Sequence, residues 1–562
     1  MALEIRQVVK PAAVDEHADQ HQVSMRDGVR LATDVYLPNR HNRVEAILVR
    51  TPYDKSSRYC ALPHHARYFA ERGYALVAQD CRGKFRSEGE TVPYTTDVAD
   101  AYDTVDWITH QPWSNGVVGL LGASYYGYTT WAGVASGHPA IRAAIPQCTG
   151  LELPDLHMAS RWRQVVPNLW GADDLIQIWT DPSDYYVTID YSRRPIIEAF
   201  QEASARLGPC RGMDILLAKS KSGETVNPFG DSHPFWTTNI PILHWAEWFD
   251  HALGPLGLRD WAWFRALPGR RDLHFMRANS ADHGGFLLED VPRRPENDYD
   301  VNDKALELKV AGEVREEADF FDMFLRQRPA QVLAGDRRVA WHLGHVGWQH
   351  AADWPLTATS SEYFLVAPAN PSTDPSGALA PRPDAQATAL RWIHDPNAPV
   401  PSSTTQDEVW TFLHDYPDES ELCRRSDVLT FTTDALDQHL DVVGPISTFL
   451  AIKSSAHSMH IFAKLFDVTP KGAVLLVSRG QVVIDGGVKL VQVDMSPTAY
   501  RFRPQHRLRL AVMSSDYPSF IVHPGTDENP WLATKTSVVE NTLTTGGLTG
   551  SRLELSTLPF SA

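Results

Sequence analysis

The chain has few cysteines and no segment typical of a membrane protein. Its five cysteines, among 562 residues, are scattered without a Cys-x-x-Cys pair, which disfavours a disulfide framework or a zinc site. No apolar run approaches the roughly 20 residues needed to span a bilayer. The N-terminal segment also lacks the long apolar stretch of a signal peptide. These absences predict a cytoplasmic protein with reduced thiols and no membrane partner.

Positive charge is also scarce relative to negative charge. The sequence has 52 Lys and Arg against 69 Asp and Glu, a net charge of −17. Nucleic acids and anionic membrane surfaces attract basic proteins, so neither is expected as a partner. The 23 histidines are dispersed, and none forms a His-Glu-x-x-His motif. No metal site is therefore predicted.

The chain is too long for a single core, and its apolar pattern divides it into regions. Residues 1–150 alternate short apolar runs with amphipathic segments, which is typical of an α/β fold with helices on both faces of a parallel sheet. Residues 151–240 carry tryptophans at helical spacing without strand alternation, which predicts a helical insertion. Residues 241–345 resume apolar strands and should complete the sheet. Residues 346–562 hold short Val-, Leu-, Thr- and Phe-rich runs between turns, which predicts an antiparallel β-sandwich.

One segment has the layout of a nucleophile elbow, Gly122-Ala-Ser-Tyr-Tyr-Gly127. A short apolar run ends at Gly122, and Ser124 precedes residues suited to starting a helix. A sharp strand-to-helix turn of this kind exposes a serine hydroxyl at the edge of a parallel sheet. The usual motif has glycine two residues after the serine, where this chain has Tyr126. The alternative interpretation is a glycine-rich turn that only packs a helix on the sheet.

An acid and a base follow in the order that α/β-hydrolases use, Ser, Asp or Glu, then His. Asp250 comes just after the predicted strand 242–246, and His283 lies in a glycine-flanked loop after the predicted strand 273–276. In this hypothesis His283 takes the Ser124 proton, and Asp250 fixes the imidazole tautomer. The rival candidates are Glu247 and Asp260 for the acid and His345 for the base.

A tetrahedral intermediate also needs hydrogen-bond donors for its oxyanion. The backbone N–H of Tyr125, the residue after the serine, is the expected first donor. The loop after an early strand, residues 50–55, lacks a His-Gly-Gly-Gly run, and Pro52 has no N–H. The phenol of Tyr53 is therefore the candidate second donor. The alternative is a buried tyrosine with an ordinary hydrogen bond.

These residues jointly resemble the CocE/NonD hydrolases, which include the bacterial cocaine esterases and are related to the serine-type X-Pro dipeptidyl-peptidases. The resemblance covers nearly the whole chain, from residue 25 to residue 520. Its most specific motifs are Arg50-Thr-Pro-Tyr53, Gln79-Asp-Cys-Arg-Gly83, Ser87-Glu-Gly89, Asp103-Thr-Val-Asp-Trp-Ile108, Gln111-Pro-Trp-Ser-Asn-Gly116, the elbow, and Trp248-Phe-Asp250.

The resemblance implies an α/β-hydrolase domain with an inserted helical cap and a C-terminal jelly-roll that helps to wall the pocket. It implies the roles given above for Ser124, Asp250, His283, Tyr53 and Tyr125. It also accounts for Tyr126, because the family's elbow has its glycine three residues after the serine. No cofactor is implied, and a homodimer is among the expected assemblies.

The chain departs from related patterns at two places. The family's Gly-Pro-Trp-x-His run before the base is replaced by Asn279-Ser-Ala-Asp-His283. Amino acid ester hydrolases place acidic residues just after the catalytic aspartate, where this chain has residues 251–253, His-Ala-Leu. An α-amino ester is therefore disfavoured as substrate, unless Glu247 or a cap carboxylate supplies the negative charge.

The leading hypothesis is a serine carboxylesterase that acts through an acyl-enzyme on a small or medium hydrophobic ester. Candidate substrate-binding residues are Trp162, Trp170 and Trp179, which otherwise form the core of the cap. Three alternatives stay open. They are an X-Pro dipeptidyl-peptidase or other amide hydrolase, an acyltransferase of a specialised metabolite pathway, and a polysaccharide esterase whose C-terminal domain binds carbohydrate.

Overall fold

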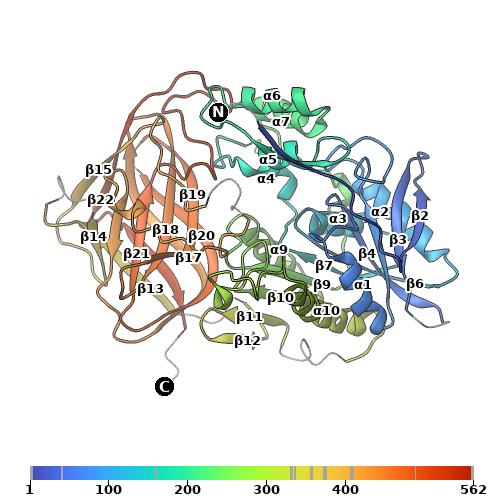
Figure 1. Cartoon of the computed structure of the whole chain (residues 1–562). Helices are drawn as coiled ribbons and strands as arrows, with labels where there is room; N and C mark the ends of the chain where they lie inside the picture. Colours follow the sequence, from blue (N-terminus) through green and yellow to red (C-terminus); the bar gives the residue numbers. More distant parts are fainter. Residues whose placement is uncertain are drawn as a thin grey trace.

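The computed structural model describes residues 4–38, 42–158, 161–329, 333, 337–354, 359–370, 376–404, 410–487 and 489–558. Two large sheets organise this part of the chain, one of ten strands and one of eleven. The eleven-stranded sheet lies to one side of the ten-stranded sheet and its helices (Figure 1). Within the described ranges, no helix is both long and apolar enough to cross a membrane.

The ten-stranded sheet has parallel strands at its centre and antiparallel strands at its edges. Its order is β12-β11-β10-β9-β7-β6-β4-β5-β3-β2. The parallel strands are β4 (Val44–Thr51), β5 (Ala75–Asp80), β6 (Ser114–Ala123), β7 (Ile141–Gln147), β9 (Ile242–Glu247), β10 (His274–Asn279) and β11 (Val339–Leu343). The antiparallel strands are β2 (Asp19–Ser24), β3 (Arg30–Tyr36) and β12 (Gly347–Ala351).

Helices cover both faces of this sheet. Successive residues of a strand point to opposite sides, so the apolar side chains on each face pack against helices. In β4, Ala46 and Leu48 join a core with α2 (Asp97–Thr109), α3 (Ser124–Ala135) and α9 (Gly254–Ala266). Ile47 and Val49 join the opposite core, with α1 (Leu62–Glu71) and α10 (Asp303–Leu325). Burial on both faces explains the continuous apolar runs of the sequence, and the predicted α/β fold is confirmed.

The sheet extends further along the chain than the sequence predicted. β12 follows residue 345 and yet pairs antiparallel with β11, from Val339 opposite Ala351 to Leu343 opposite Gly347. A tight turn returns the chain, with the N–H of Val346 donating to the carbonyl of Leu343 at 2.9 Å. The α/β sheet therefore takes in residues that the boundary at 345/346 assigned to the C-terminal domain.

The insertion between β7 and β9 is mostly helical but also contains a strand. Its helices are α4 (Leu153–Met158), α5 (Trp170–Gln177), α6 (Ile197–Leu207), α7 (Arg211–Ser222) and α8 (Pro234–Thr237). The strand β8 (Asp184–Thr188) pairs antiparallel with β1 (Glu4–Val9) from the start of the chain. Sequence analysis missed β8 because five residues beside an aromatic-rich segment give too short a pattern. Short 3₁₀ turns occur at Gly230–Ser232, Arg271–Leu273, Leu288–Asp290 and Leu422–Arg424.

The C-terminal sheet closes on itself as a sandwich. Its strands are β13 (Thr359–Val366), β14 (Ser376–Ala380), β15 (Thr388–His394), β16 (Leu429–Thr432), β17 (Leu440–Ser454), β18 (Ser458–Val468), β19 (Val474–Asp485), β20 (Lys489–Phe502), β21 (Arg507–Met513), β22 (Val539–Thr545) and β23 (Arg552–Thr557). The last strand, β23, pairs with both β13 and β17, which joins distant positions of the strand order. The predicted jelly-roll type of sandwich is confirmed.

The sandwich and the α/β sheet share one hydrophobic core. Trp248, after β9, stacks on Trp354 with ring centroids 5.4 Å apart. Phe249 contacts Tyr500 of β20 edge-on at 6.5 Å. Both residues lie in the same buried cluster as the interior of the sandwich. This common core fixes the loop that follows β9.

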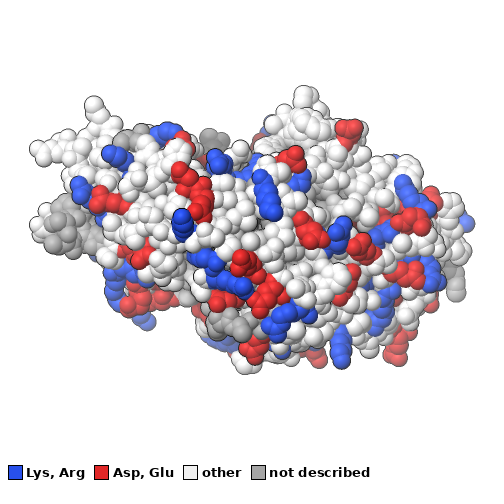
Figure 2. Space-filling view, turned by 90° about the horizontal axis from the view of Figure 1, so that it is seen from above, with Lys and Arg blue, Asp and Glu red and all other residues white. Residues whose placement is uncertain are grey.

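Charged side chains are interspersed over the surface seen from above. On that face Lys and Arg alternate with Asp and Glu, and neither sign forms a large continuous patch (Figure 2). The excess of negative charge is therefore not concentrated on that side of the molecule.

The packing of α10 on the sheet predicts the effect of one core substitution. The Phe321 ring lies so close to β6 that a Cβ on Gly119 would come within 2.6 Å of it. Phe321→Ala should cost about 3–5 kcal/mol of stability, because it removes a buried ring and leaves a cavity. Leu308→Ala on the same helix is the matched control, since Leu308 is 67% exposed. Thermal unfolding should show a lower midpoint for the first variant only; equal midpoints would contradict this packing.

Candidate active site

The predicted elbow is present where β6 meets α3. Strand β6 ends at Ala123 and helix α3 begins at Ser124, whose φ of 56° is unusual for a residue other than glycine. A Cβ on Gly122 would come within 2.2 Å of the Tyr126 carbonyl oxygen, and one on Gly127 within 2.8 Å of the Gln147 oxygen. The turn thus requires glycine two residues before and three residues after the serine.

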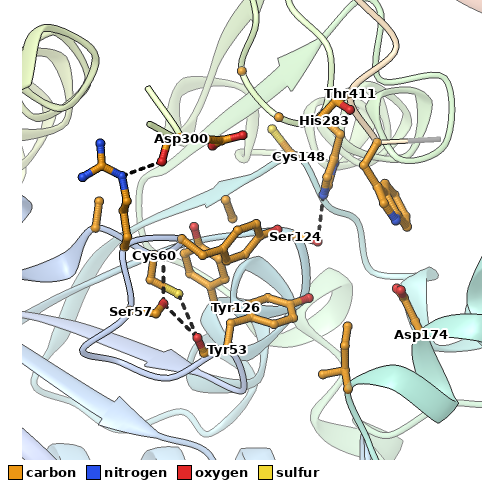
Figure 3. Close-up of a pocket in the computed structure, with 18 of the residues that line it drawn as sticks. Tyr53, Ser57, Cys60, Ser124, Tyr126, Cys148, Asp174, His283, Asp300 and Thr411 are labelled. Atoms are coloured by element: carbon orange, nitrogen blue, oxygen red, sulfur yellow. Dashed lines mark hydrogen bonds between the residues drawn. The ribbon is translucent and has the colours of Figure 1, made fainter. Parts of the chain in front are cut away.

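The structure brings Ser124, His283 and Asp250 together. His283 Nε2 lies 3.0 Å from Ser124 Oγ, and His283 Nδ1 lies 2.7 Å from Asp250 Oδ2. The imidazole points at the serine hydroxyl from the opposite wall of the cavity (Figure 3). The side chains of Asp250 and His283 are almost completely buried. This arrangement is the hydrogen-bonded chain that an activated serine requires.

Backbone hydrogen bonds join the loops that carry Asp250 and His283. The N–H of Trp248 donates to the carbonyl of Asn279 at 2.8 Å, and that of Phe249 donates to the carbonyl of Ala281 at 2.9 Å. These bonds tie the loop after β9 to the loop after β10. Asp250 Oδ1 also accepts the N–H of Leu253 at 2.9 Å, which orients its carboxylate.

Asp282, the neighbour of His283, anchors the loop of His283 to the C-terminal domain. Its carboxylate accepts the N–H of Leu413 at 2.8 Å and the N–H of Phe286 at 3.0 Å. Burial raises the pKa of Asp282 to about 7, and these two hydrogen bonds act against that shift. The Asp282 side chain therefore stabilises the loop that carries His283. Among the described residues, it forms no hydrogen bond with Ser124.

The rival acids and base lie in other surroundings. His345 Nε2 is 3.2 Å from the Tyr500 hydroxyl, in the sandwich interface. Asp260 accepts the N–H of Leu151 at 2.7 Å. Glu247 accepts the indole N–H of Trp245 at 3.0 Å. Among the described residues, Asp250 is the only carboxylate that accepts a hydrogen bond from His283.

Tyr53 lines the cavity near the serine. Its ring meets those of Tyr59 and Tyr126 edge-on, with centroids 5.4 Å and 6.0 Å apart. Burial raises the pKa of the Tyr53 phenol well above its usual value, whereas hydrogen bonding to Ser124 acts in the opposite direction. The phenol therefore keeps its proton at neutral pH and is available as a donor.

The Tyr125 side chain points away from Ser124. Its hydroxyl donates to Asp97 Oδ2 at 3.1 Å and accepts the N–H of Tyr94 at 3.0 Å. Tyr125 is the second residue of α3, so its backbone N–H is one of the four that lack a partner within the helix. The side chain of Tyr125 is therefore engaged elsewhere, and a role for this residue beside Ser124 falls to its backbone N–H, which stays a prediction.

A cavity of about 1200 Å³ surrounds Ser124 and His283. All three parts of the chain contribute to its wall. Trp170 of α5 comes from the cap, and Trp410, Thr411, Pro518 and Ser519 come from the C-terminal domain. Asp174 of α5 and Thr411 face the same space from different sides (Figure 3).

Of the three predicted tryptophans, Trp170 alone lines the described part of this cavity. Trp179 is buried behind the elbow, with its ring 4.4 Å from that of Tyr125. Trp162 lies under the guanidinium of Arg163, at 4.8 Å. Spacing along a helix could not separate the wall of the cavity from the interior of the cap.

Sequence analysis missed Trp410, which contacts the ring of His283 directly. Its ring centroid lies 4.6 Å from that of His283 and 5.0 Å from that of Trp170. The carbonyl of Trp410 also accepts the N–H of Gly284 at 3.1 Å. No motif surrounds this tryptophan in the sequence, because its position depends on how the sandwich docks.

Comparison with known proteins links these features to a family. A family model of the X-Pro dipeptidyl-peptidase (S15 family) matches residues 27–267, and one of the X-Pro dipeptidyl-peptidase C-terminal non-catalytic domain matches residues 330–554. The cocaine esterase of Rhodococcus sp. (strain MB1 Bresler) is 29% identical over 548 residues, which cover 90% of this chain and 91% of that protein. The chain belongs to the CocE/NonD hydrolases. It is a serine hydrolase, and the resemblance seen in its motifs is confirmed.

Solved structures share the fold of this CocE/NonD hydrolase. An aminopeptidase from a marine sediment archaeon, Thaumarchaeota archaeon, superposes with a TM-score of 0.77 at 20% identity, over 97% of both chains. An α-amino acid ester hydrolase superposes with a TM-score of 0.77 at 21% identity, also over 97% of both chains. At these identities the likeness establishes the fold alone.

The described residues of this CocE/NonD hydrolase contain neither a metal-binding cluster nor a disulfide. Among the described residues, no three His, Cys, Asp or Glu side chains are grouped so as to hold a metal ion. All five cysteines lie in the described ranges and are buried free thiols. The chemistry supported by the cavity is that of its serine, histidine, carboxylates and phenols.

The tight elbow predicts the effect of a single methyl group. Gly122→Ala should slow covalent labelling by a fluorophosphonate about 100-fold, because the helix must shift and carry Ser124 out of reach of His283. Gly312→Ala in α10 is the control, since its new Cβ meets nothing within 4 Å. That control should label normally and gain about 1 kcal/mol of helix stability. Normal labelling of the first variant would show that the elbow tolerates a side chain.

Proposed function

We propose that this enzyme hydrolyses carboxylic esters of small or medium hydrophobic acids through an acyl-enzyme on Ser124. The observation that carries the proposal is the position of His283, with Nε2 at 3.0 Å from the serine oxygen and Nδ1 at 2.7 Å from Asp250. A neutral imidazole in this position accepts the hydroxyl proton while Asp250 holds the Nδ1–H.

The reaction then proceeds in two halves. Ser124 Oγ attacks the ester carbonyl as His283 takes its proton, and the carbonyl oxygen becomes an oxyanion. The Tyr53 O–H and the Tyr125 N–H donate hydrogen bonds to that oxygen. Collapse breaks the bond to the alcohol, which leaves with the proton held by His283. Water repeats the sequence on the acyl-enzyme, releases the acid and restores Ser124.

The wall of the cavity favours a substrate with apolar groups. Tyr59, Tyr126, Trp170 and Trp410 present aromatic surface around the serine. Aromatic side chains offer a large apolar area with few rotatable bonds, so they lose little conformational entropy when they bind a small acyl or alcohol group. The cavity volume of about 1200 Å³ also accommodates such esters.

Replacement of the proposed nucleophile tests the assignment. Ser124→Ala should reduce turnover of p-nitrophenyl butyrate by about 10⁴-fold or more, because among the described residues Ser124 carries the hydroxyl that is hydrogen-bonded to His283 Nε2. The measurement is the initial rate of p-nitrophenol release, together with intact-mass detection of the acyl-enzyme in the wild type. Ser204→Ala in α6 is the matched control. Turnover by Ser124→Ala close to that of the control would refute the proposal.

Replacement of Tyr53 tests its proposed role as a hydrogen-bond donor to the oxyanion. Tyr53→Phe removes one hydroxyl and should lower kcat for the same ester by about 10²–10³-fold, with a small change in KM, because the lost hydrogen bond forms mainly in the transition state. Tyr102→Phe on α2 serves as the control. An unchanged kcat would mean that Tyr53 has only a packing role.

A further inference from the structure

The cavity has a second wall that the proposed reaction does not use. Glu247, the last residue of β9, and Glu313 and Glu317 of α10 all line it. We call these three residues the acidic wall. Helix α10 reaches this position because it packs over the end of β7, where the Gln147 amide donates to Glu317 Oε1 at 2.8 Å.

Two carboxylates of the acidic wall are buried and incompletely hydrogen-bonded. Glu247 is 6% exposed and Glu317 is 1% exposed. In the described part of the chain, Oε2 of each has no hydrogen-bond partner. An unpartnered carboxylate oxygen away from water is costly, so a ligand that supplies the missing donor would be bound favourably here.

The neighbouring cations are paired with carboxylates other than those of Glu247 and Glu317. Lys309 Nζ donates to Glu313 Oε1 at 2.7 Å. Arg277 Nη1 lies 2.6 Å from Glu316 Oε2. His65, from α1, is 3.8 Å from Glu313. Glu247 and Glu317 therefore lack an ion-pair partner of their own among the described residues.

The pKa values of Glu317 and Glu247 are raised, which is consistent with two buried carboxylates that have no ion-pair partner among the described residues. Burial raises the pKa of Glu317 to about 8, and the nearby Glu313 and Glu316 raise it further, while Gln147 and Lys309 lower it. Burial also raises the pKa of Glu247 well above its usual value, with Asp250 and Glu313 adding to the shift and Trp245 and Arg277 opposing it. Cys148, at the end of β7, keeps its thiol proton because burial raises its pKa as well. A cation bound here would restore the charged form of both carboxylates.

Other acidic groups of the cavity differ because they have basic or polar partners. Asp174 of the cap lies 3.4 Å from His157 Nε2. Asp184 pairs with Lys84 at 2.7 Å. Among the described residues that line the cavity, Glu247 and Glu317 have buried carboxylate oxygens with neither a hydrogen-bond partner nor an ion-pair partner.

We propose that the acidic wall binds a primary ammonium group of the substrate, so that the preferred ester carries an amine on its acyl part or on its alcohol part. This inference rests on the proposed ester hydrolysis at Ser124, since both features line one cavity. A primary ammonium has three N–H donors, which match the free Oε2 atoms of Glu247 and Glu317 together with the Glu313 carboxylate.

Matched pairs of esters test the inference in the full-length enzyme. One series consists of p-nitrophenyl esters of ω-amino acids of increasing length, each compared with the ester in which a methyl replaces the ammonium. A second series consists of butyrate esters of ω-amino alcohols and of the matching alkyl alcohols. At the best length in one series, kcat/KM should favour the amine by at least about tenfold, the usual scale for a charged hydrogen bond. The series that shows the preference identifies the side of the ester that reaches the wall.

Variants of the wall separate charge from packing. Glu317→Gln and Glu247→Gln keep shape and remove charge, and each should reduce the amine preference about tenfold while changing turnover of the methyl ester less than about threefold. Glu71→Gln, on the exposed side of α1, is the matched control and should keep the preference. If a wall variant does not fold, competitive inhibition of the wild type by ω-amino alcohols, compared with alkyl alcohols, measures the same preference.

The preference should also depend on pH in a defined direction. Glu317 binds the ammonium as a carboxylate, so the amine preference should increase from about pH 6 to about pH 9 as this group, with a pKa of about 8, loses its proton. The amine itself stays protonated to about pH 10. Glu317→Gln should flatten the increase.

The outcomes distinguish this inference from the proposed function. Turnover of methyl-terminated esters that requires Ser124, without any preference for the amine in either series, overturns the ammonium site and leaves the esterase proposal intact. A preference that survives in both wall variants also overturns it. Absence of Ser124-dependent turnover of every ester tested would overturn the proposed function itself.

Discussion

The parallel pairing of β9 with β10 is the constraint on which the site depends. Their register runs from Ile242 opposite His274 to Glu247 opposite Asn279, so both strands end at the same edge of the sheet. Two backbone hydrogen bonds continue that pairing into the loops of Asp250 and His283. Strand β6, which delivers Ser124, is separated from β9 by β7 alone. Adjacent strands lie about 4.8 Å apart, so a histidine loop after β10 must reach back over two strands to meet the serine. The backbone hydrogen bonds between the two loops fix the position of His283 relative to Ser124.

The C-terminal domain supports the loops of Asp250 and His283 and closes one side of the cavity. Its core is continuous with the packing around Trp248 and Phe249, next to Asp250. Leu413 holds Asp282 from the same side, and Trp410 lies against His283. His283 is thus held by contacts from both domains, which leaves its ring little freedom to rotate away from Ser124. The sandwich therefore restricts the geometry of a group that belongs to another domain.

The sequence predicted much of this arrangement, because strands, turns and the residues that follow them can be recognised within short segments. The elbow around Ser124, the loop positions of Asp250 and His283 and the strands before them follow from short apolar runs and turn residues. Their catalytic roles are proposals that the experiments above address. Contacts between distant segments left no comparable pattern: the pairing of β8 with β1, the tryptophan at 410 and the acidic wall on α10 depend on docking. Trp162, Trp170 and Trp179 illustrate the same limit, since one shared spacing placed them in three different surroundings.

The contribution of residues 410, 411, 518 and 519 to the cavity has a consequence for the order of events during synthesis. The ribosome completes the elbow, the acid and the base well before it reaches the segment around Ser519. Until that segment leaves the exit tunnel and the sandwich closes, His283 lacks its aromatic neighbour and the cavity lacks one side. The nascent chain thus holds Ser124, Asp250 and His283 before the cavity around them is complete, and the finished cavity depends on docking of the C-terminal domain.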